Sequence, residues 1–163
     1  MLNKYFYCFV ISMAPLIELR GAIPIAQAFH TADPSFNMLA AYIIIAIGNM
    51  IPVPIIFFFA RRVLEWGADK KVIGKFFSFC LNKGHKGGEK LKATAGKGLY
   101  IALLLFVGIP LPGTGAWTGT LAASFLDMDF KKSVLAVLGG VALAGVIMGV
   151  LSFAVASGVT AIG

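Results

Sequence analysis

The sequence predicts an all-α integral membrane protein, built from two inverted repeats that each combine a broken re-entrant hairpin with a spanning helix. Of the 163 residues, 59% are hydrophobic and only 13% are charged, and the mean hydropathy is +0.89. Soluble domains carry about 25% charged residues. Two long apolar runs without charges alternate with two apolar runs that are interrupted by Gly, Pro and polar residues. The length fits a single membrane domain over residues 1–163.

The uninterrupted runs are Phe36–Ala60 and Val134–Thr160, each of which is long enough to cross a bilayer as a helix. The second run is rich in Gly and Ala, which let helices approach closely in lipid. It contains a GxxxG pattern from Gly145 to Gly149. For this pattern we favour packing within the chain over a specific dimer.

The interrupted runs are Tyr5–His30 and Leu99–Leu126. A helix over Tyr5–Ile17 would rise only about 20 Å, which is less than the bilayer core of about 30 Å. The second run is divided by GIPLPGTGAWTG, Gly108 to Gly119. Each run therefore predicts two half-length helices joined by irregular backbone.

The two halves of the chain resemble each other. Pro15-Leu16 precedes Gly21-Ala22, and Pro110-Leu111 precedes Gly115-Ala116, with an offset of about 94 residues. Paired short, Gly/Pro-interrupted segments indicate a transporter built from inverted repeats. We assign repeat 1 to residues 5–60 and repeat 2 to residues 99–160.

The net charge of +7 is concentrated in the segment between the repeats, residues 61–98. Ten of the 14 basic residues lie there with three acidic residues, while the rest of the chain carries four of each. The positive-inside rule places such a loop in the cytoplasm, which explains the charge better than nucleic-acid binding does. Within it, DKKVIGKFFSFCLNKG has apolar residues at helical spacing and predicts an amphipathic helix on the inner leaflet.

Two topologies fit these features. In the first, both interrupted runs are re-entrant hairpins, entering from opposite sides of the membrane. In the second, each run spans, which gives four kinked helices. Lys131 and Lys132 in the turn before the last run favour the hairpins, because that turn is then cytoplasmic.

Other features exclude several classes of protein. Cys8 and Cys80 are isolated, and the sequence has no metal-binding cluster of Cys and His. We expect no cofactor and no enzyme activity, because no catalytic set of side chains lies in the apolar runs. Glu18 and Arg20 interrupt what otherwise resembles a signal peptide, so we expect the N-terminus to be retained.

Three motifs resemble the putative small multidrug export family of bacterial and archaeal membrane proteins. They are ELRGAIP (Glu18–Pro24), Gly48-Asn49 followed by Pro52 and Pro54, and VGIPLPGTGAWTG (Val107–Gly119). The family is distantly similar to the DedA/VTT superfamily, which implies paired re-entrant hairpins, a prokaryotic plasma-membrane location and links to lipid and proton-coupled transport. The last of these motifs, in the second predicted hairpin, lacks the arginine that DedA proteins have there.

The candidate site residues are those that place charge, hydroxyl groups or irregular backbone inside the predicted membrane region. They are Glu18, Arg20, Gly21, Pro24, Asn49, Pro110, Pro112, Gly113, Thr114, Gly115 and Trp117. Charged residues in lipid are expensive and mark functional sites by default. Residues two apart on a helix face different ways, so we expect the backbone at Gly21 and Pro24 to unwind if Glu18 and Arg20 meet. Otherwise each needs a partner elsewhere, such as Asn49, Gln27 or freed backbone groups.

We expect a secondary transporter that exports small molecules, with a midplane site at the two turns and proton coupling. The alternative is a DedA-like translocase or scramblase of phospholipid or polyprenyl-phosphate, and a third option is a membrane protein without transport. We also expect contact with membrane lipids, a homo-oligomer and no nucleic-acid partner.

Overall fold

The structure is a computed structural model that describes residues 2–15, 17–60, 98–126 and 128–162, with isolated positions between 62 and 89. The predicted amphipathic helix and Cys80 fall outside these continuous ranges. All described elements are helical and none is a strand, which confirms the all-α class. They are α1 (Leu2–Met13), α2 (Glu18–Ala32), α3 (Met38–Met50), α4 (Pro52–Ile55), the π-helical turn η1 (Ile56–Ala60), α7 (Leu99–Gly108), α8 (Ala116–Phe125) and α9 (Phe130–Ile162).

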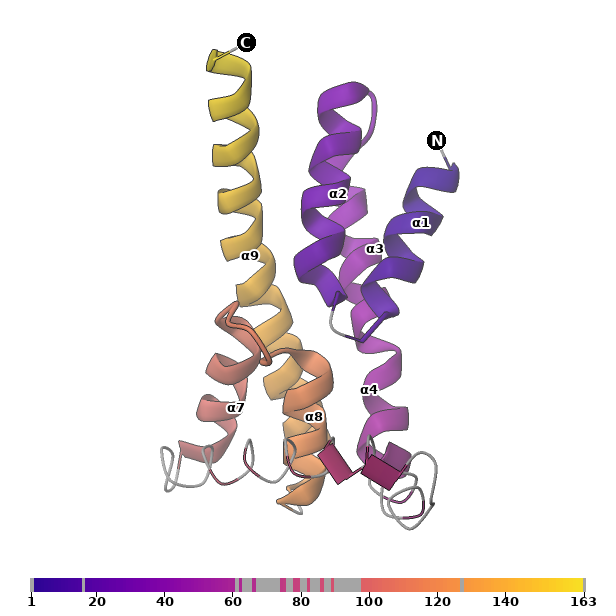
Figure 1. The fold of residues 1–163 in the computed structure, drawn as a ribbon, viewed down its shortest axis with the longest axis vertical. Coiled ribbons are helices and arrows are strands. Elements are labelled where there is room, and N and C mark those ends of the chain that lie inside the picture. Colours follow the sequence, from indigo (N-terminus) through magenta and orange to yellow (C-terminus); the bar gives the residue numbers. More distant parts are fainter. Residues whose placement is uncertain are drawn as a thin grey trace.

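The short helices form two antiparallel pairs that point toward each other (Figure 1). The α1–α2 pair occupies one end of the molecule, and its turn lies near the middle of the long axis. The α7–α8 pair occupies the opposite end, and its turn also lies near the middle. The two turns therefore meet inside the protein, flanked by the longer helices.

Two helices are long and apolar enough to cross a membrane, at Met38–Phe59 and Phe130–Gly158. They correspond to the two predicted spans. The first is divided at Ile51, just before Pro52, and becomes π-helical at Ile56. Ser124 of α8 donates a hydrogen bond of 2.7 Å to the carbonyl of Phe57 in this π-helical turn.

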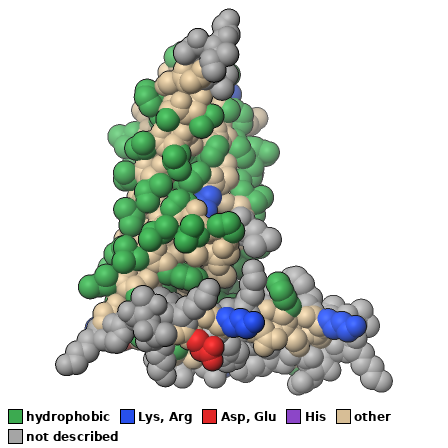
Figure 2. All heavy atoms as spheres, turned by 60° about the vertical axis from the view of Figure 1, so that its left-hand side comes forward, with side chains coloured by type: hydrophobic (Ala, Val, Ile, Leu, Met, Phe, Trp, Pro, Cys, Tyr) green, Lys and Arg blue, Asp and Glu red, His purple; other side chains and the backbone are tan. Residues whose placement is uncertain are grey.

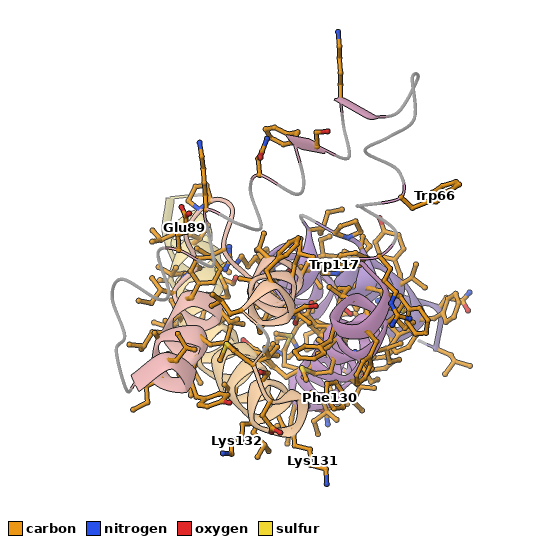
Figure 3. All side chains as sticks on the ribbon, turned by 90° about the horizontal axis from the view of Figure 1, so that it is seen from below. Trp66, Glu89, Trp117, Phe130, Lys131 and Lys132 are labelled. Carbon is orange, nitrogen blue, oxygen red and sulfur yellow. The ribbon has the colours of Figure 1, made fainter. Side chains whose placement is uncertain are left out.

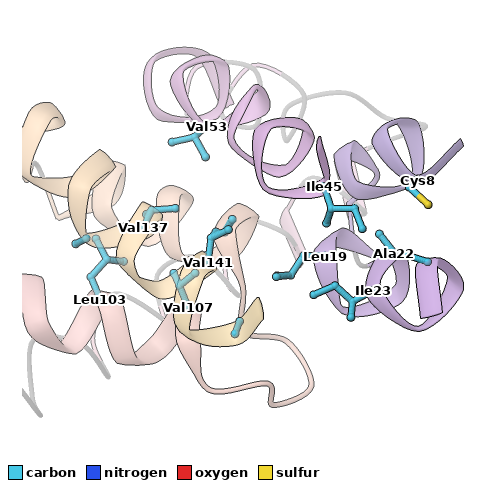
Figure 4. Close-up of a cluster of buried hydrophobic side chains, with 14 of the residues drawn as sticks. Cys8, Leu19, Ala22, Ile23, Ile45, Val53, Leu103, Val107, Val137 and Val141 are labelled. Carbon is cyan, nitrogen blue, oxygen red and sulfur yellow. The ribbon is translucent and has the colours of Figure 1, made fainter. Parts of the chain in front are cut away.

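The buried core draws on both halves of the chain (Figure 4). Leu19 and Ile23 of α2 and Ile45 of α3 belong to it, as do Val107 of α7 and Val141 of α9. The outer face of the upright helices is covered with hydrophobic side chains, and charged side chains concentrate at the lower end (Figure 2). Such a surface suits contact with lipid rather than water.

Several glycines of α9 allow close contact with other helices of the same chain. A Cβ atom on Gly140 would lie 2.6 Å from Cβ of Val107, so α7 and α9 touch backbone to backbone there. On the other side of α9, Gly149 lies against the hydroxyl of Tyr42 and Gly145 against Leu19.

The two halves share a pair of contacts at the start of each long helix. The hydroxyl of Tyr5 accepts a hydrogen bond from the backbone N–H of Asn37, and the hydroxyl of Tyr100 accepts one from Asp129. The side chains of these two donor residues also cap the helix that follows each of them. Asn37 accepts a hydrogen bond from the N–H of Ala40, and Asp129 accepts one from the N–H of Lys132. Tyr100 follows Tyr5 by 95 residues and Asp129 follows Asn37 by 92, close to the predicted offset.

The contacts of Asp33, in the turn between α2 and α3, predict that its contribution to the stability of the fold depends on pH. The hydroxyl of Ser35 and the ammonium of Lys4, 2.9 Å away, bind Asp33 and lower the pKa of its carboxyl from 3.8 to about 2. Asp33 therefore stabilises the fold fully above its unfolded pKa, and this contribution is lost as the pH falls through about 2. We expect Ser35→Ala to raise the pKa of Asp33 in a carbon-13 NMR titration. An unchanged titration would contradict this account.

Candidate functional site

Glu18 is the first residue of α2, and its carboxylate lies at the N-terminus of α8. The backbone N–H groups of Ala116 and Trp117 each donate a hydrogen bond of 3.0 Å to it. The side chain is only 4% exposed, and the backbone of Glu18 has a φ of 49°, which is uncommon for a residue other than glycine. A carboxylate at a helix N-terminus binds the free amides and is favoured by the helix dipole. Glu18 thus caps a helix that begins 98 residues later.

Gly115 makes this contact possible. Its φ of 132° and ψ of −176° place it in a region that is essentially restricted to glycine. A Cβ atom there would lie 2.9 Å from the carboxyl carbon of Glu18. Gly113, with a φ of 80°, supplies a second left-handed residue in the same turn. The glycines therefore bend the turn and leave room for the carboxylate.

Arg20 binds the other side of the same turn, where α7 ends. Its guanidinium donates hydrogen bonds of 2.6 Å to the carbonyl of Leu111 and 2.7 Å to the hydroxyl of Thr114. Longer contacts of 3.4 and 3.5 Å reach the carbonyls of Ile109 and Val107. A cation at a helix C-terminus satisfies the free carbonyls and complements the dipole. The two charges of ELRGAIP therefore hold the two helix ends that flank the second turn; we call this set of contacts the latch.

Of the two alternatives for Glu18 and Arg20, the structure has partners on another element and no unwinding at Gly21 and Pro24. α2 runs from Glu18 to Ala32 with Pro24 inside it, and the chain breaks earlier, before Glu18. Pro24 removes only the hydrogen bond to the carbonyl of Arg20, and the helix continues. Gly21 is needed for close packing, because a Cβ atom there would collide with the side chain of Ile17. Freed backbone groups, rather than a salt bridge, are the partners of both charges.

The remaining candidates divide into turn residues and buried polar groups. Pro110 and Pro112 lie in the turn between α7 and α8, and the hydroxyl of Thr114 lies 3.0 Å from the carbonyl of Ile109 within it. Trp117 contacts Glu18 through its backbone, and its indole nitrogen is buried without a partner among the described residues. The amide of Asn49 is also buried and unpaired within the described part of the chain.

Viewed from the α7–α8 end, Trp117 lies among the helices, whereas Lys131 and Lys132 point away from them (Figure 3). The charged groups of the described helices packed against the latch are therefore far from it. On α1, Lys4 is paired with Asp33 at the opposite end, and on α9 the lysines occupy the first turn. Arg20 is the charged neighbour of Glu18 in this part of the structure.

An apolar groove of about 620 Å³ adjoins the latch. It lies between α2, α3 and α9, and Leu19, which separates Glu18 from Arg20, forms part of its wall. Its lining is apolar apart from the hydroxyl of Tyr42, and it includes Leu19, Ile23, Tyr42, Val141, Gly145 and Gly149. The groove fits an apolar molecule or chain segment.

The sequence indicated freed backbone groups and Thr114 as candidates, but it did not show which carbonyls bind Arg20, because backbone carbonyls carry no residue signature. Sequence reasoning also missed Leu19 and Tyr42 as groove residues, since apolar residues in an apolar helix do not stand out.

In the described part of the chain, no group of three or more His, Cys, Asp or Glu residues is placed to hold a metal.

One of three comparisons with known proteins found a match. No curated protein and no solved structure matched the chain. The family model described as "Putative small multi-drug export protein" matches residues 18–147. The match begins at Glu18 and includes every residue of the latch, from Glu18 and Arg20 to the α7–α8 turn. Because it covers most of the sequence, this chain belongs to the putative small multi-drug export protein family.

Proposed function

We propose that this protein is a secondary transporter that exports small apolar molecules in exchange for protons, with Glu18 as the proton-binding residue. The observation that supports this most directly is the buried carboxylate of Glu18, which joins the two halves by binding the N–H groups of Ala116 and Trp117. A carboxylate buried inside the helical bundle of a membrane protein is a common type of proton site.

Protonation changes the strength of the latch. The ionised carboxylate accepts charge-assisted hydrogen bonds from both amides, and these are about twice as strong as neutral ones. A protonated Glu18 loses that charge and its favourable interaction with the α8 dipole. The N-terminus of α8 is then released from Glu18, while Arg20 of the same helix α2 still holds the carbonyl side of the turn. Binding and release of a proton thus favour two arrangements of the halves, as alternating access requires.

The arrangement of the helices supports the re-entrant interpretation of the two pairs. Both turns end midway along the molecule and approach from opposite ends (Figure 1), and the matching contacts of Tyr5 and Tyr100 support a common origin of the halves. We propose that these are inverted repeats in a prokaryotic plasma membrane, with residues 61–98 in the cytoplasm.

The apolar groove is the proposed substrate site. Its volume of about 620 Å³ lies within the range of about 300–1,000 Å³ that is typical of small-molecule pockets. Because Leu19 lines it, a bound molecule lies beside the backbone that positions Glu18. The groove is open on one side, and we propose that lipid or a second copy of the chain closes it.

The DedA-like alternative requires Arg20 to bind a phosphate group of a lipid. Both terminal nitrogens of Arg20 already donate to the α7–α8 turn, so a phosphate must first displace these contacts. The structure therefore favours the exporter, and the lipid translocase remains the outcome to test against it.

The deciding experiment measures flux in proteoliposomes, with a lipophilic cationic dye in one arm and a labelled polyprenyl-phosphate in the other. We expect dye transport that depends on an imposed proton gradient, and we expect Glu18→Gln to abolish this dependence. Asp33→Asn makes the same carboxylate-to-amide change outside the latch and should retain coupling. If only the lipid moves, and Arg20→Ala is the more damaging variant, the translocase is correct and the exporter is not.

A further inference from the structure

Three polar side chains of this protein are almost completely buried and have no hydrogen-bond partner in the described part of the chain: Asn49, Thr120 and Ser133. Ser133 lies in the first turn of α9, away from the other two. Asn49 of α3 is 0% exposed and Thr120 of α8 is 1% exposed. Neither takes part in the latch. A buried polar group without a partner costs about 1–3 kcal/mol, so each native example requires an explanation.

The register between α8 and the first long helix puts Asn49 and Thr120 about one helical turn apart along the molecule. Both elements run toward the same end of the molecule (Figure 1), and the bond from Ser124 to the carbonyl of Phe57 fixes their alignment. Moving back four residues at a time along both helices, or about 6 Å per step, places Thr120 opposite Val53. A second step places Ala116 opposite Asn49.

This alignment connects the two unpaired groups to Glu18. Ala116 is the residue whose N–H binds the Glu18 carboxylate, so the Asn49 amide lies at the level of the latch. Thr120 lies one turn further along, and Ser124 one turn beyond it, toward the end from which α9 starts. We call this row the α8 seam: Asn49, Thr120 and Ser124.

The chemistry of the seam selects its ligand. A cation is disfavoured beside the positive N-terminus of α8 and the guanidinium of Arg20. An anion is disfavoured beside the Glu18 carboxylate. A neutral molecule that both donates and accepts matches the Asn49 amide, the Thr120 hydroxyl and the free lone pairs of Glu18. Buried water typically makes about three such bonds to otherwise unsatisfied groups.

We infer that the α8 seam binds a file of internal water which connects Glu18 to the α7–α8 end of the molecule. Asn49 and Thr120 are its main ligands, and the hydroxyl of Ser124 marks its outer end. The role of this water, delivery of protons to Glu18, rests on the proposed function, whereas its presence does not. Protons then reach the latch from the side on which the basic segment is expected.

The presence of the water can be tested without transport. The full chain is prepared in lipid with nitrogen-15 in its asparagine side chains, and magnetisation transfer from water is measured by solid-state NMR. We expect transfer to one buried side-chain amide, assigned to Asn49 by its loss in Asn49→Leu. Thr120→Val should weaken the transfer, and Thr118→Val, which makes the same change on the opposite side of α8, should not. Absence of transfer to Asn49 would overturn the inference.

The proton-delivery role has its own test. In the proteoliposome assay we expect Thr120→Val to slow proton-driven dye flux several-fold, with dye movement down its own gradient unchanged and Thr118→Val behaving as the parent chain. If water contacts Asn49 but Thr120→Val leaves proton-driven flux unaffected, the delivery role is wrong. If the parent chain moves no dye although water contacts Asn49, the proposed function fails and the hydrated seam stands.

Discussion

Gly115→Ala is expected to lower the free energy of unfolding by about 3 kcal/mol or more. The backbone conformation of Gly115, with φ of 132° and ψ of −176°, costs another residue about 1–3 kcal/mol. The added methyl group also occupies the space of the Glu18 carboxyl, whose carbon would lie 2.9 Å away. Glu18 must then leave the amides of Ala116 and Trp117, and these N–H groups at the start of α8 lose their acceptor. Unfolding in bicelles, followed by steric trapping, measures the change.

Gly158→Ala provides the matched control for this prediction. A Cβ atom on Gly158, in the last part of α9, meets no atom within 4 Å. The substitution should be neutral or stabilising, because alanine is favoured over glycine in a helix by about 1 kcal/mol. If the two variants are equally stable, the tight contact between Gly115 and Glu18 does not exist in the protein.

A double variant separates strain from loss of the latch. Combining Gly115→Ala with Glu18→Gln should cost less than the sum of the single changes, because both remove the same contact. The destabilisation that Gly115→Ala still causes when Glu18→Gln is already present measures the backbone strain at Gly115 alone. Additivity within about 0.5 kcal/mol would show that the two residues do not interact.

The elements of this fold follow from local features of the sequence. Unbroken apolar runs predicted both long helices, and Gly and Pro predicted a break in each remaining run. The break in the first run is shorter than the interrupting residues indicated, because the chain turns before Glu18 and Pro24 is tolerated inside α2. Helix interruption by proline depends on what satisfies the freed carbonyl, and sequence does not show this.

The candidate site was predictable in its residues but not in its contacts. Two charges in an apolar segment had to find partners, and freed backbone groups were among the expected ones. Which backbone groups they are depends on how the halves meet, 87 to 99 residues away along the chain. The Asn49–Thr120 relation depends on the alignment of α8 with α4 and η1, which only the three-dimensional structure supplies.

Arg20→Lys is expected to destabilise the protein by about 2 kcal/mol even though it retains the positive charge. The guanidinium of Arg20 reaches the carbonyl of Leu111 and the hydroxyl of Thr114 at the same time. A planar group with five donors in a fixed geometry bridges two such acceptors, whereas an ammonium is a compact point charge on a flexible chain. Hydrogen bonds to charged groups contribute about 1.5–3 kcal/mol each, so losing one of the two accounts for the expected effect.

The comparison with Arg20→Gln distinguishes geometry from charge. Glutamine keeps donors but loses the charge that complements the C-terminus of α7, and we expect a loss of about 3 kcal/mol or more, because acceptors in the membrane interior are then left unpaired. Lys131→Gln removes a charge from an exposed position on α9 and should change stability by less than about 0.5 kcal/mol. If Arg20→Lys is as stable as the parent chain while Arg20→Gln is not, charge alone holds the α7–α8 turn. In that case the forked geometry of the contact with Leu111 and Thr114 contributes nothing, and the positive charge accounts for the whole Arg20 side of the latch.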